Sequence, residues 1–150
     1  MNIQIRDAVP ADRDVIVRFN ADLARETEGK TLDEARLAAG VERLLAERTR
    51  GRYFLATVDD RVSGSTMITR EWTDWRDGWF WWIQSVWVEP DCRRRGVFGA
   101  LYRHVRELAQ RDPDVRGLRL YVEGANQRAQ DTYGSLGMAM TGYRVMEEEF

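Results

Sequence analysis

Apolar side chains recur along the chain with two different periods, and the alternation between these periods predicts the order of its elements. A period of two, or an unbroken apolar run, predicts strands over residues 3–7, 52–58, 61–70, 79–88, 118–123 and 138–147. Spacings of three and four predict helices over residues 15–23, 37–45, 97–108 and 129–136. The pair Asp59-Asp60 lies between two of the strands and indicates a tight hairpin.

The resulting order, β-α-α-β-β-β-α-β-α-β, predicts an α+β fold with a mixed, mostly antiparallel central sheet and flanking helices. Residues 79–122 form a strand–helix–strand unit, so these two strands are expected to be parallel. No repeat, low-complexity tract or linker-like stretch divides the sequence. We therefore expect a single domain over residues 1–150.

Composition narrows the chemistry that this domain can perform. The chain of 150 residues has 25 acidic and 23 basic side chains, a formal charge of −2, one cysteine and one histidine. An internal disulfide is impossible, and Cys92 and His104 are too few for a zinc site, so no metal is expected. The near-neutral charge does not favour nucleic acid, and no apolar run is long enough for a membrane span. We expect a cytoplasmic protein that binds neither nucleic acid nor membrane.

The most informative segment follows the apolar strand over residues 79–88. It contains three consecutive arginines, Arg93 to Arg95, and then Gly96 and Gly99 at the start of a helix. Free amides and the positive dipole end at a helix N-terminus bind anions, and glycine lets a phosphate approach the backbone. Arginine adds forked donors that fit phosphate oxygens. The alternative is a solvated loop whose glycines only cap the helix.

Two motifs carry a resemblance to a known family. The first, Arg93-x-x-Gly96-x-Phe98, resembles the Q/R-x-x-G-x-G/A signature of the GNAT superfamily of acyl-CoA-dependent N-acetyltransferases. The second, Asn126-x-x-Ala129-x-x-x-Tyr133-x-x-x-Gly137-Met138, is similar to a further signature of that family. Phe98 departs from the family pattern, and its side chain must point away from the cofactor.

The resemblance implies acetyl-CoA as cosubstrate and direct transfer of its acetyl group to a primary amine of a small molecule or peptide. The diphosphate would lie on the amides of residues 94–99, and the pantetheine arm would pair with the edge of residues 86–89. The implied cofactor-binding residues are Val86, Trp87, Val88, Arg93, Arg94, Arg95, Gly96, Val97, Phe98, Gly99, Asn126, Ala129 and Tyr133.

In the same family a tyrosine protonates the leaving thiolate, and Tyr133 occupies its position. No motif identifies the general base, for which Glu26 and Glu28 rank ahead of Asp74 and Glu123. These four carboxylates can also be ordinary surface groups.

The acceptor site is the least specified part of the sequence. All six tryptophans lie within residues 72–87, where they can cage a cationic amine or simply pack in the core or a dimer interface. The expected acceptor-lining residues are Glu26, Glu28, Trp75, Trp82, Gln84 and Glu123.

Two other functions stay open at this point. One is a CoA-binding sensor that has lost catalysis. The other is a P-loop hydrolase, because residues 24–31 fit a loose Walker pattern that contains Lys30. A helix is expected before that pattern, where a true P-loop has a strand. A homodimer also stays open.

Overall fold

A computed structural model describes all 150 residues, and contacts divide the chain into two compact units, residues 1–120 and 121–150. In the first unit the strands are β1 (Ile3–Asp7), β2 (Arg52–Val58), β3 (Arg61–Thr73), β4 (Gly78–Val88) and β5 (Val115–Leu120). The helices are α1 (Arg13–Glu28), α2 (Glu34–Ala46) and α3 (Val97–Arg111). Short 3-10 turns are η1 (Pro10–Asp12), η2 (Asp74–Arg76) and η3 (Pro90–Cys92).

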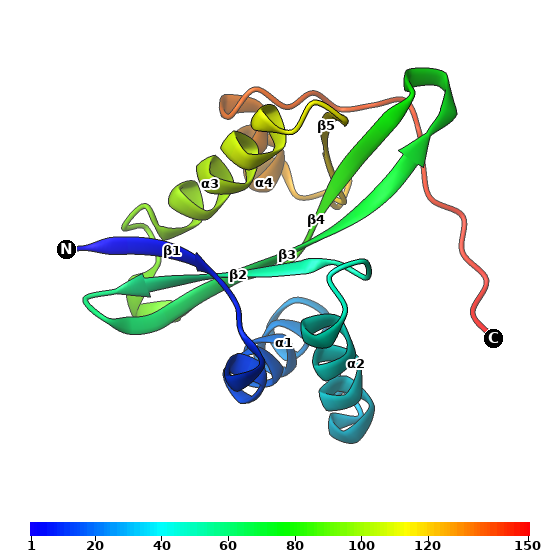
Figure 1. Cartoon of the computed structure of the whole chain (residues 1–150). Helices are drawn as coiled ribbons and strands as arrows, with labels where there is room; N and C mark the ends of the chain where they lie inside the picture. Colours follow the sequence, from blue (N-terminus) through cyan, green and yellow to red (C-terminus); the bar gives the residue numbers. More distant parts are fainter. The chain divides into compact units, whose positions relative to one another are not determined.

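The five strands form one sheet in the order β1-β2-β3-β4-β5. Neighbours from β1 to β4 are antiparallel, whereas β4 and β5 are parallel and are joined by α3. The predicted α+β class and the mixed, mostly antiparallel sheet are therefore confirmed. Figure 1 shows α1 and α2 on one side of the sheet and α3 on the other.

Alternation along β2 explains why both faces of the sheet are covered. Tyr53 and Leu55 are buried with Ile16 of α1 and Val41 of α2. Phe54, between them in sequence, points to the opposite face and contacts the His104 ring of α3 at 5.3 Å between ring centres. Side chains that alternate along a strand can thus fill two separate core layers.

No helix in the chain combines the length and apolar character that crossing a bilayer requires.

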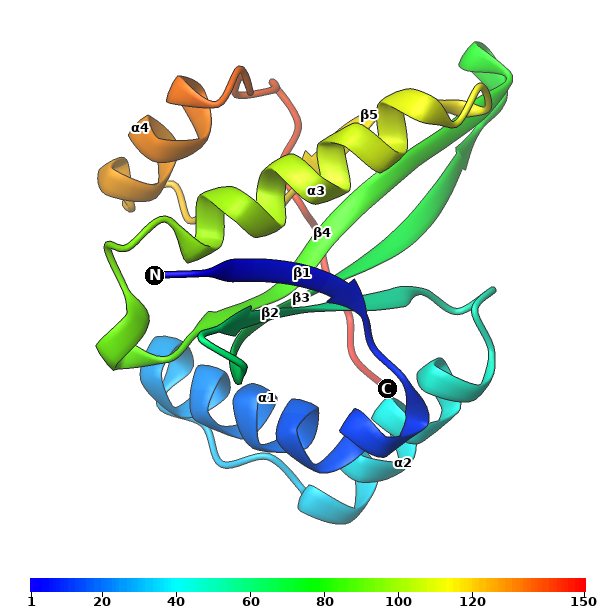
Figure 2. The same cartoon turned by 60° about the vertical axis from the view of Figure 1, so that its left-hand side comes forward.

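Strands β3 and β4 form a long hairpin that extends beyond β1 and β2 (Figure 2), and β5 pairs with β4 from Trp79 to Ile83. The pairing of β2 with β3 ends at Ile68, whereas β3 continues to pair with β4 as far as Thr73 and Gly78. The predicted strand over residues 61–70 is therefore three residues longer than expected. Residues 71–73, which lie between the two predicted strands, continue β3, and the η2 turn closes the hairpin.

The second unit contains one helix, α4 (Gln127–Ser135). The Asn126 side chain caps it by accepting a hydrogen bond from the Ala129 amide at 3.0 Å. The predicted strand over residues 138–147 is wrong, because these residues have no strand partner and expose Tyr143 and Met146. The predicted strand over 118–123 also ends early, at Leu120. Alternation indicates a strand only where a neighbouring edge supplies backbone partners.

Candidate active site

The bend between β4 and α3 brings the first sequence motif together. Its first part is folded on itself: the Cys92 amide donates to the Glu89 carbonyl at 2.8 Å, and the Glu89 amide donates to the Ser63 carbonyl of β3 at 2.8 Å. Arg94 and Gly96 then adopt left-handed backbone conformations, with φ of 62° and 85°. Gly96 is the N-cap of α3 and places no side chain over the helix end.

Several amides of this bend have no acceptor within the protein. They belong to Arg94, Arg95, Gly96, Val97 and Gly99. An added Cβ at Gly96 would meet no atom within 4 Å, so the space beside this residue is open. Unpaired amides around left-handed residues at a helix N-terminus form a concave anion site, so the residues present fit a diphosphate.

The three arginines of the motif differ in their contacts. Arg93 donates through Nε to the Val88 carbonyl at 2.9 Å and through both terminal nitrogens to Glu26, at 2.6 and 2.7 Å. Arg94 and Arg95 are exposed and have no ion pair. The positive charge available to a ligand therefore comes from these two residues.

Two side chains of α3, Phe98 and Arg103, lie next to the anion site. Phe98 lies 6.3 Å from the Tyr102 ring, measured between ring centres, so its side chain packs along α3. Arg103 was not anticipated from the sequence: its Nη1 lies 3.1 Å from where a Gly99 Cβ would be. Arg103 follows Gly99 by four residues, and this helical spacing is the signal that would have found it.

Beside the bend, the edge of β4 that faces β5 is without a partner from Gln84 onward. The parallel pairing ends at Ile83 with Leu120, so Val86, Trp87 and Val88 offer backbone groups along a free edge.

A bulge in β4 adjoins this edge. Ser85, at φ 51°, is the residue where the register with β3 shifts. Tyr53 lies beneath it and hydrogen-bonds Ser85, and Asn20 of α1 donates to the Tyr53 hydroxyl at 3.2 Å. Burial raises the pKa of Tyr53. A partly buried polar pair, Asn20 and Tyr53, thus contacts a strand residue with a left-handed backbone beside the free edge.

In the second unit, the second motif spans α4, from its N-cap to Gly137 and Met138 just after its end. Asn126 is the N-cap, Ala129 lies in the first turn, and Tyr133 lies at the end of the second. Burial raises the pKa of Tyr133, so its phenol keeps its proton at neutral pH. Glu123 precedes the helix as an exposed side chain, and its backbone carbonyl accepts from Gln130 at 3.1 Å.

The remaining carboxylates proposed as bases differ in environment. Hydrogen bonding to Arg93 lowers the pKa of Glu26. Glu28 is exposed at the end of α1 and has no ion pair. Asp74 accepts a hydrogen bond from the Trp75 amide at 2.9 Å within the η2 turn. Of these three carboxylates only Glu28 has no hydrogen-bond or ion-pair partner, a property that it shares with the carboxylate of Glu123.

On the α1/α2 face of the sheet, the structure joins Trp82 to a carboxylate that sequence reasoning missed. Trp82 Nε1 donates to Glu71 at 3.0 Å, and Arg119 donates to the same oxygen at 2.7 Å. Both donors lower the pKa of Glu71. Gln84, two residues along the same strand face, donates to Thr69 at 2.5 Å. Pairing of β3 with β4 brings these residues together, and sequence spacing alone does not reveal it.

Trp75 lies away from this group, at the tip of the hairpin, and is 85% exposed.

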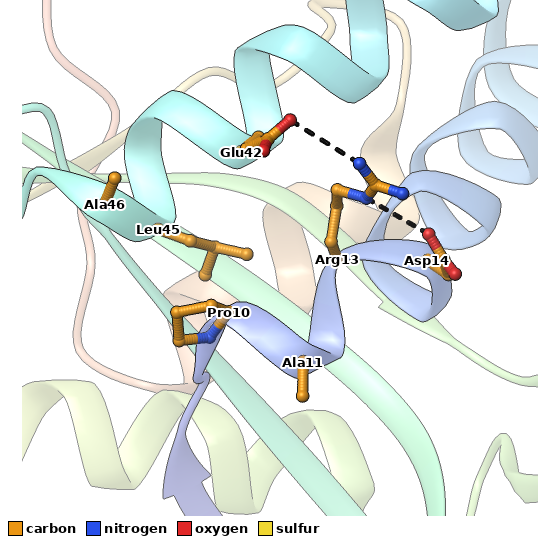
Figure 3. A pocket seen from close by; sticks show the side chains of 7 residues that line it. All are labelled: Pro10, Ala11, Arg13, Asp14, Glu42, Leu45 and Ala46. Atoms are coloured by element: carbon orange, nitrogen blue, oxygen red, sulfur yellow. Dashed lines mark hydrogen bonds and ion pairs between the residues drawn. The ribbon is translucent and has the colours of Figure 1, made fainter.

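A separate cavity of about 400 Å³ lies at the other end of α1, between η1 and the end of α2 (Figure 3). Arg13 lines it and is paired with Asp14 and Glu42. Arg13 and Glu26 are thirteen residues apart on one helix, which is roughly 20 Å, so this cavity is not part of the bend.

The P-loop alternative fails, because Gly29 and Lys30 follow the end of α1 instead of beginning a helix.

Comparison with known proteins agrees with this geometry. The model of the acetyltransferase (GNAT) family matches residues 18–138. The chain therefore belongs to the GNAT acetyltransferase family. No curated protein sequence matches it.

Among solved structures, a possible acetyltransferase from Clostridium difficile 630 is 44% identical, with a TM-score of 0.93 over 100% of this chain and 99% of that one. A ribosomal-protein-alanine N-acetyltransferase from Brucella melitensis biovar Abortus 2308 is 16% identical, with a TM-score of 0.77 over 99% of both chains. An aminoglycoside acetyltransferase from an uncultured soil metagenomic sample is also 16% identical, with a TM-score of 0.76 over the full length of both. The last two likenesses show the fold alone.

Proposed function

We propose that this protein is an acetyl-CoA-dependent N-acetyltransferase whose acceptor is a primary amine of a small molecule or peptide. The observation that carries the proposal is the set of unpaired amides at Arg94, Arg95, Gly96, Val97 and Gly99 in front of α3. Such amides bind the diphosphate of CoA without a metal, because the helix dipole and the two free arginines compensate its charge.

The pantetheine arm would lie along the unpaired edge of β4. Its two amides can hydrogen-bond the backbone of Val86 to Val88 as an added strand does. This placement directs the thioester toward the bulge at Ser85. The supporting observation is that the β4–β5 pairing ends at Ile83, which leaves that edge free.

The chemical step we propose is direct attack. A neutral amine nitrogen forms a bond to the thioester carbonyl carbon, the carbon–sulfur bond breaks, and the products are an N-acetylated amine and CoA. Glu28, directly or through water, takes the proton that the acceptor ammonium must lose. Tyr133 gives its phenol proton to the departing thiolate, and its raised pKa suits a group that must be protonated before it acts.

The acceptor would approach the α1/α2 face of the sheet, where Trp82 and Gln84 lie, with Trp75 of the hairpin tip at its margin. An indole face attracts an ammonium group, and Gln84 can hydrogen-bond a polar acceptor. The names of two structural neighbours specify an acceptor, which is a ribosomal-protein alanine in one and an aminoglycoside in the other. A screen of small-molecule and peptide amines, read by release of free thiol, would identify the acceptor.

Tyr133→Phe tests the mechanism once an acceptor is found. We expect kcat to fall about 100-fold or more, the range that a lost general acid produces, with CoA affinity unchanged. A protein that binds CoA but acetylates no amine before the substitution would be the sensor instead. Unchanged kcat in the variant would remove Tyr133 from the mechanism.

A further inference from the structure

Arg93 is the most heavily engaged side chain of the bend. Its guanidinium donates twice to Glu26, once through Nε to the Val88 carbonyl, and lies 4.9 Å over the Trp87 ring, measured from Cζ to the ring centre. Glu26 thus holds the planar group from one side while the end of β4 holds it from the other. A two-pronged guanidinium–carboxylate pair sets orientation as well as distance.

Glu26 comes from a different part of the fold, 67 residues earlier in the chain. A second ion pair of opposite polarity joins the same two elements: Arg18 of α1 donates to Glu89 at 2.6 Å. The Trp87 indole also donates to Glu89, at 3.4 Å. Helix α1 is therefore tied to the start of the bend at two points, two turns apart.

This arrangement assigns different tasks to the arginines and carboxylates of the site. The charge of Arg93 is balanced by Glu26, so Arg93 acts on the backbone of the bend more than on a ligand. Hydrogen bonds from Arg93 lower the pKa of Glu26, which makes Glu26 a weak proton acceptor. Its geometry suits a group that holds another in place.

We propose that Glu26 is a positioning residue: by holding both terminal nitrogens of Arg93, it keeps the bend in the conformation that presents its amides to the diphosphate of the acyl-CoA. The inference rests on the function proposed above. It separates the two carboxylates at the end of α1, since Glu28 acts on the acceptor and Glu26 acts on the cofactor site through Arg93. Glu26 is about half-exposed, so its loss changes global stability little.

Glu26→Gln tests this role, with Arg25→Gln as matched control. Arg25 is the neighbouring residue, and its ion pair with Asp22 stays within α1. For Glu26→Gln we expect the Kd for CoA and the KM for acetyl-CoA to rise about three- to tenfold, as the loss of charge-assisted hydrogen bonds between partly exposed groups allows. We expect kcat, its pH profile and the melting temperature to stay close to those of the unaltered protein and the control.

Arg93→Lys is a second variant that keeps the charge but loses the fork, and it should weaken CoA binding to the same degree. A fall in kcat with an altered pH profile at constant KM would overturn the proposal and make Glu26 the base. Unchanged CoA affinity in both variants would also overturn it. If the unaltered protein does not bind CoA in titration calorimetry, the proposed function itself fails. If it binds CoA and the two variants bind equally well, only the positioning role of Glu26 fails.

Discussion

The two ends of β4 use the same residue types for different purposes. At its C-terminal end, Trp87 is only 6% exposed and lies between the Phe19 ring and the Arg93 guanidinium. Each of the three guanidinium nitrogens of that arginine donates to an acceptor. These contacts connect the strand to α1 and to the bend that precedes α3.

At the N-terminal end of β4, tryptophans and arginines also stack, but near solvent. Trp79 packs edge-on against Trp72 at 5.0 Å between ring centres. The Arg70 guanidinium lies over the Trp79 ring, 4.9 Å from its centre. Trp72 is half-exposed, and Trp75 is almost fully exposed. No helix covers this end of the hairpin.

The comparison shows that aromatic–arginine stacking alone does not define a functional site. The C-terminal end differs because helix α1 supplies a carboxylate for the arginine and because a glycine-capped helix follows. Four substitutions or measurements separate the two ends.

Trp87→Ala should have the largest effect. Removing a buried tryptophan should cost about 3–5 kcal/mol of unfolding free energy, because the cavity between Phe19 and Arg93 cannot close fully. Chemical denaturation followed by circular dichroism measures the loss. A cost as small as that of a surface substitution would contradict the packing described for this end.

Gly96→Glu should come next and should act on binding. A carboxylate at the N-cap of α3 would face the diphosphate, so we expect CoA affinity to fall about 100-fold or more, as several kcal/mol of like-charge repulsion require. Gly96→Ala is the control: it has the same left-handed strain, without the charge, and its Cβ meets no atom within 4 Å. Equal CoA affinities for the two variants in calorimetry would refute the anion site.

Trp75→Ala should leave stability within about 0.5 kcal/mol, because this side chain is already exposed to solvent. If the hairpin tip contributes to the acceptor site, the KM for the amine rises and the KM for acetyl-CoA does not. A large loss of stability would show that the hairpin end is built like the other end.

Arg93→Gln should have the smallest effect, a change in the pKa of one carboxylate. The two carboxylates to compare are Glu26 near the bend and Glu71 in the hairpin. Both have lowered pKa values, so each stabilises the fold above its unfolded pKa, and this contribution is lost as pH falls through the folded pKa. Arg93→Gln should return the pKa of Glu26 to its ordinary range and leave that of Glu71 unchanged, since Trp82 and Arg119 hold Glu71. Carboxyl NMR titration measures both, and a joint shift would contradict separate networks.

Local patterns predicted most of the elements. Apolar periodicity gave the sheet strands, the helices and the parallel crossover, because burial imposes a period of two on strands and of about 3.6 on helices. It failed for residues 138–147. Their alternation satisfies one requirement of a strand, but these residues pair with no neighbouring edge, which is the other requirement.

The cofactor motifs were visible because their residues are close in sequence, within a single bend or a single helix. The chain alone determined that glycines and arginines follow a central strand, since the turn and the helix start are local structures. Only the tertiary structure decided that Arg93 is bound by Glu26 and that Glu71 joins Trp82 and Arg119. These contacts connect residues 67, 11 and 48 positions apart, and the energy of an ion pair or hydrogen bond depends on distance in space, which sequence spacing does not encode.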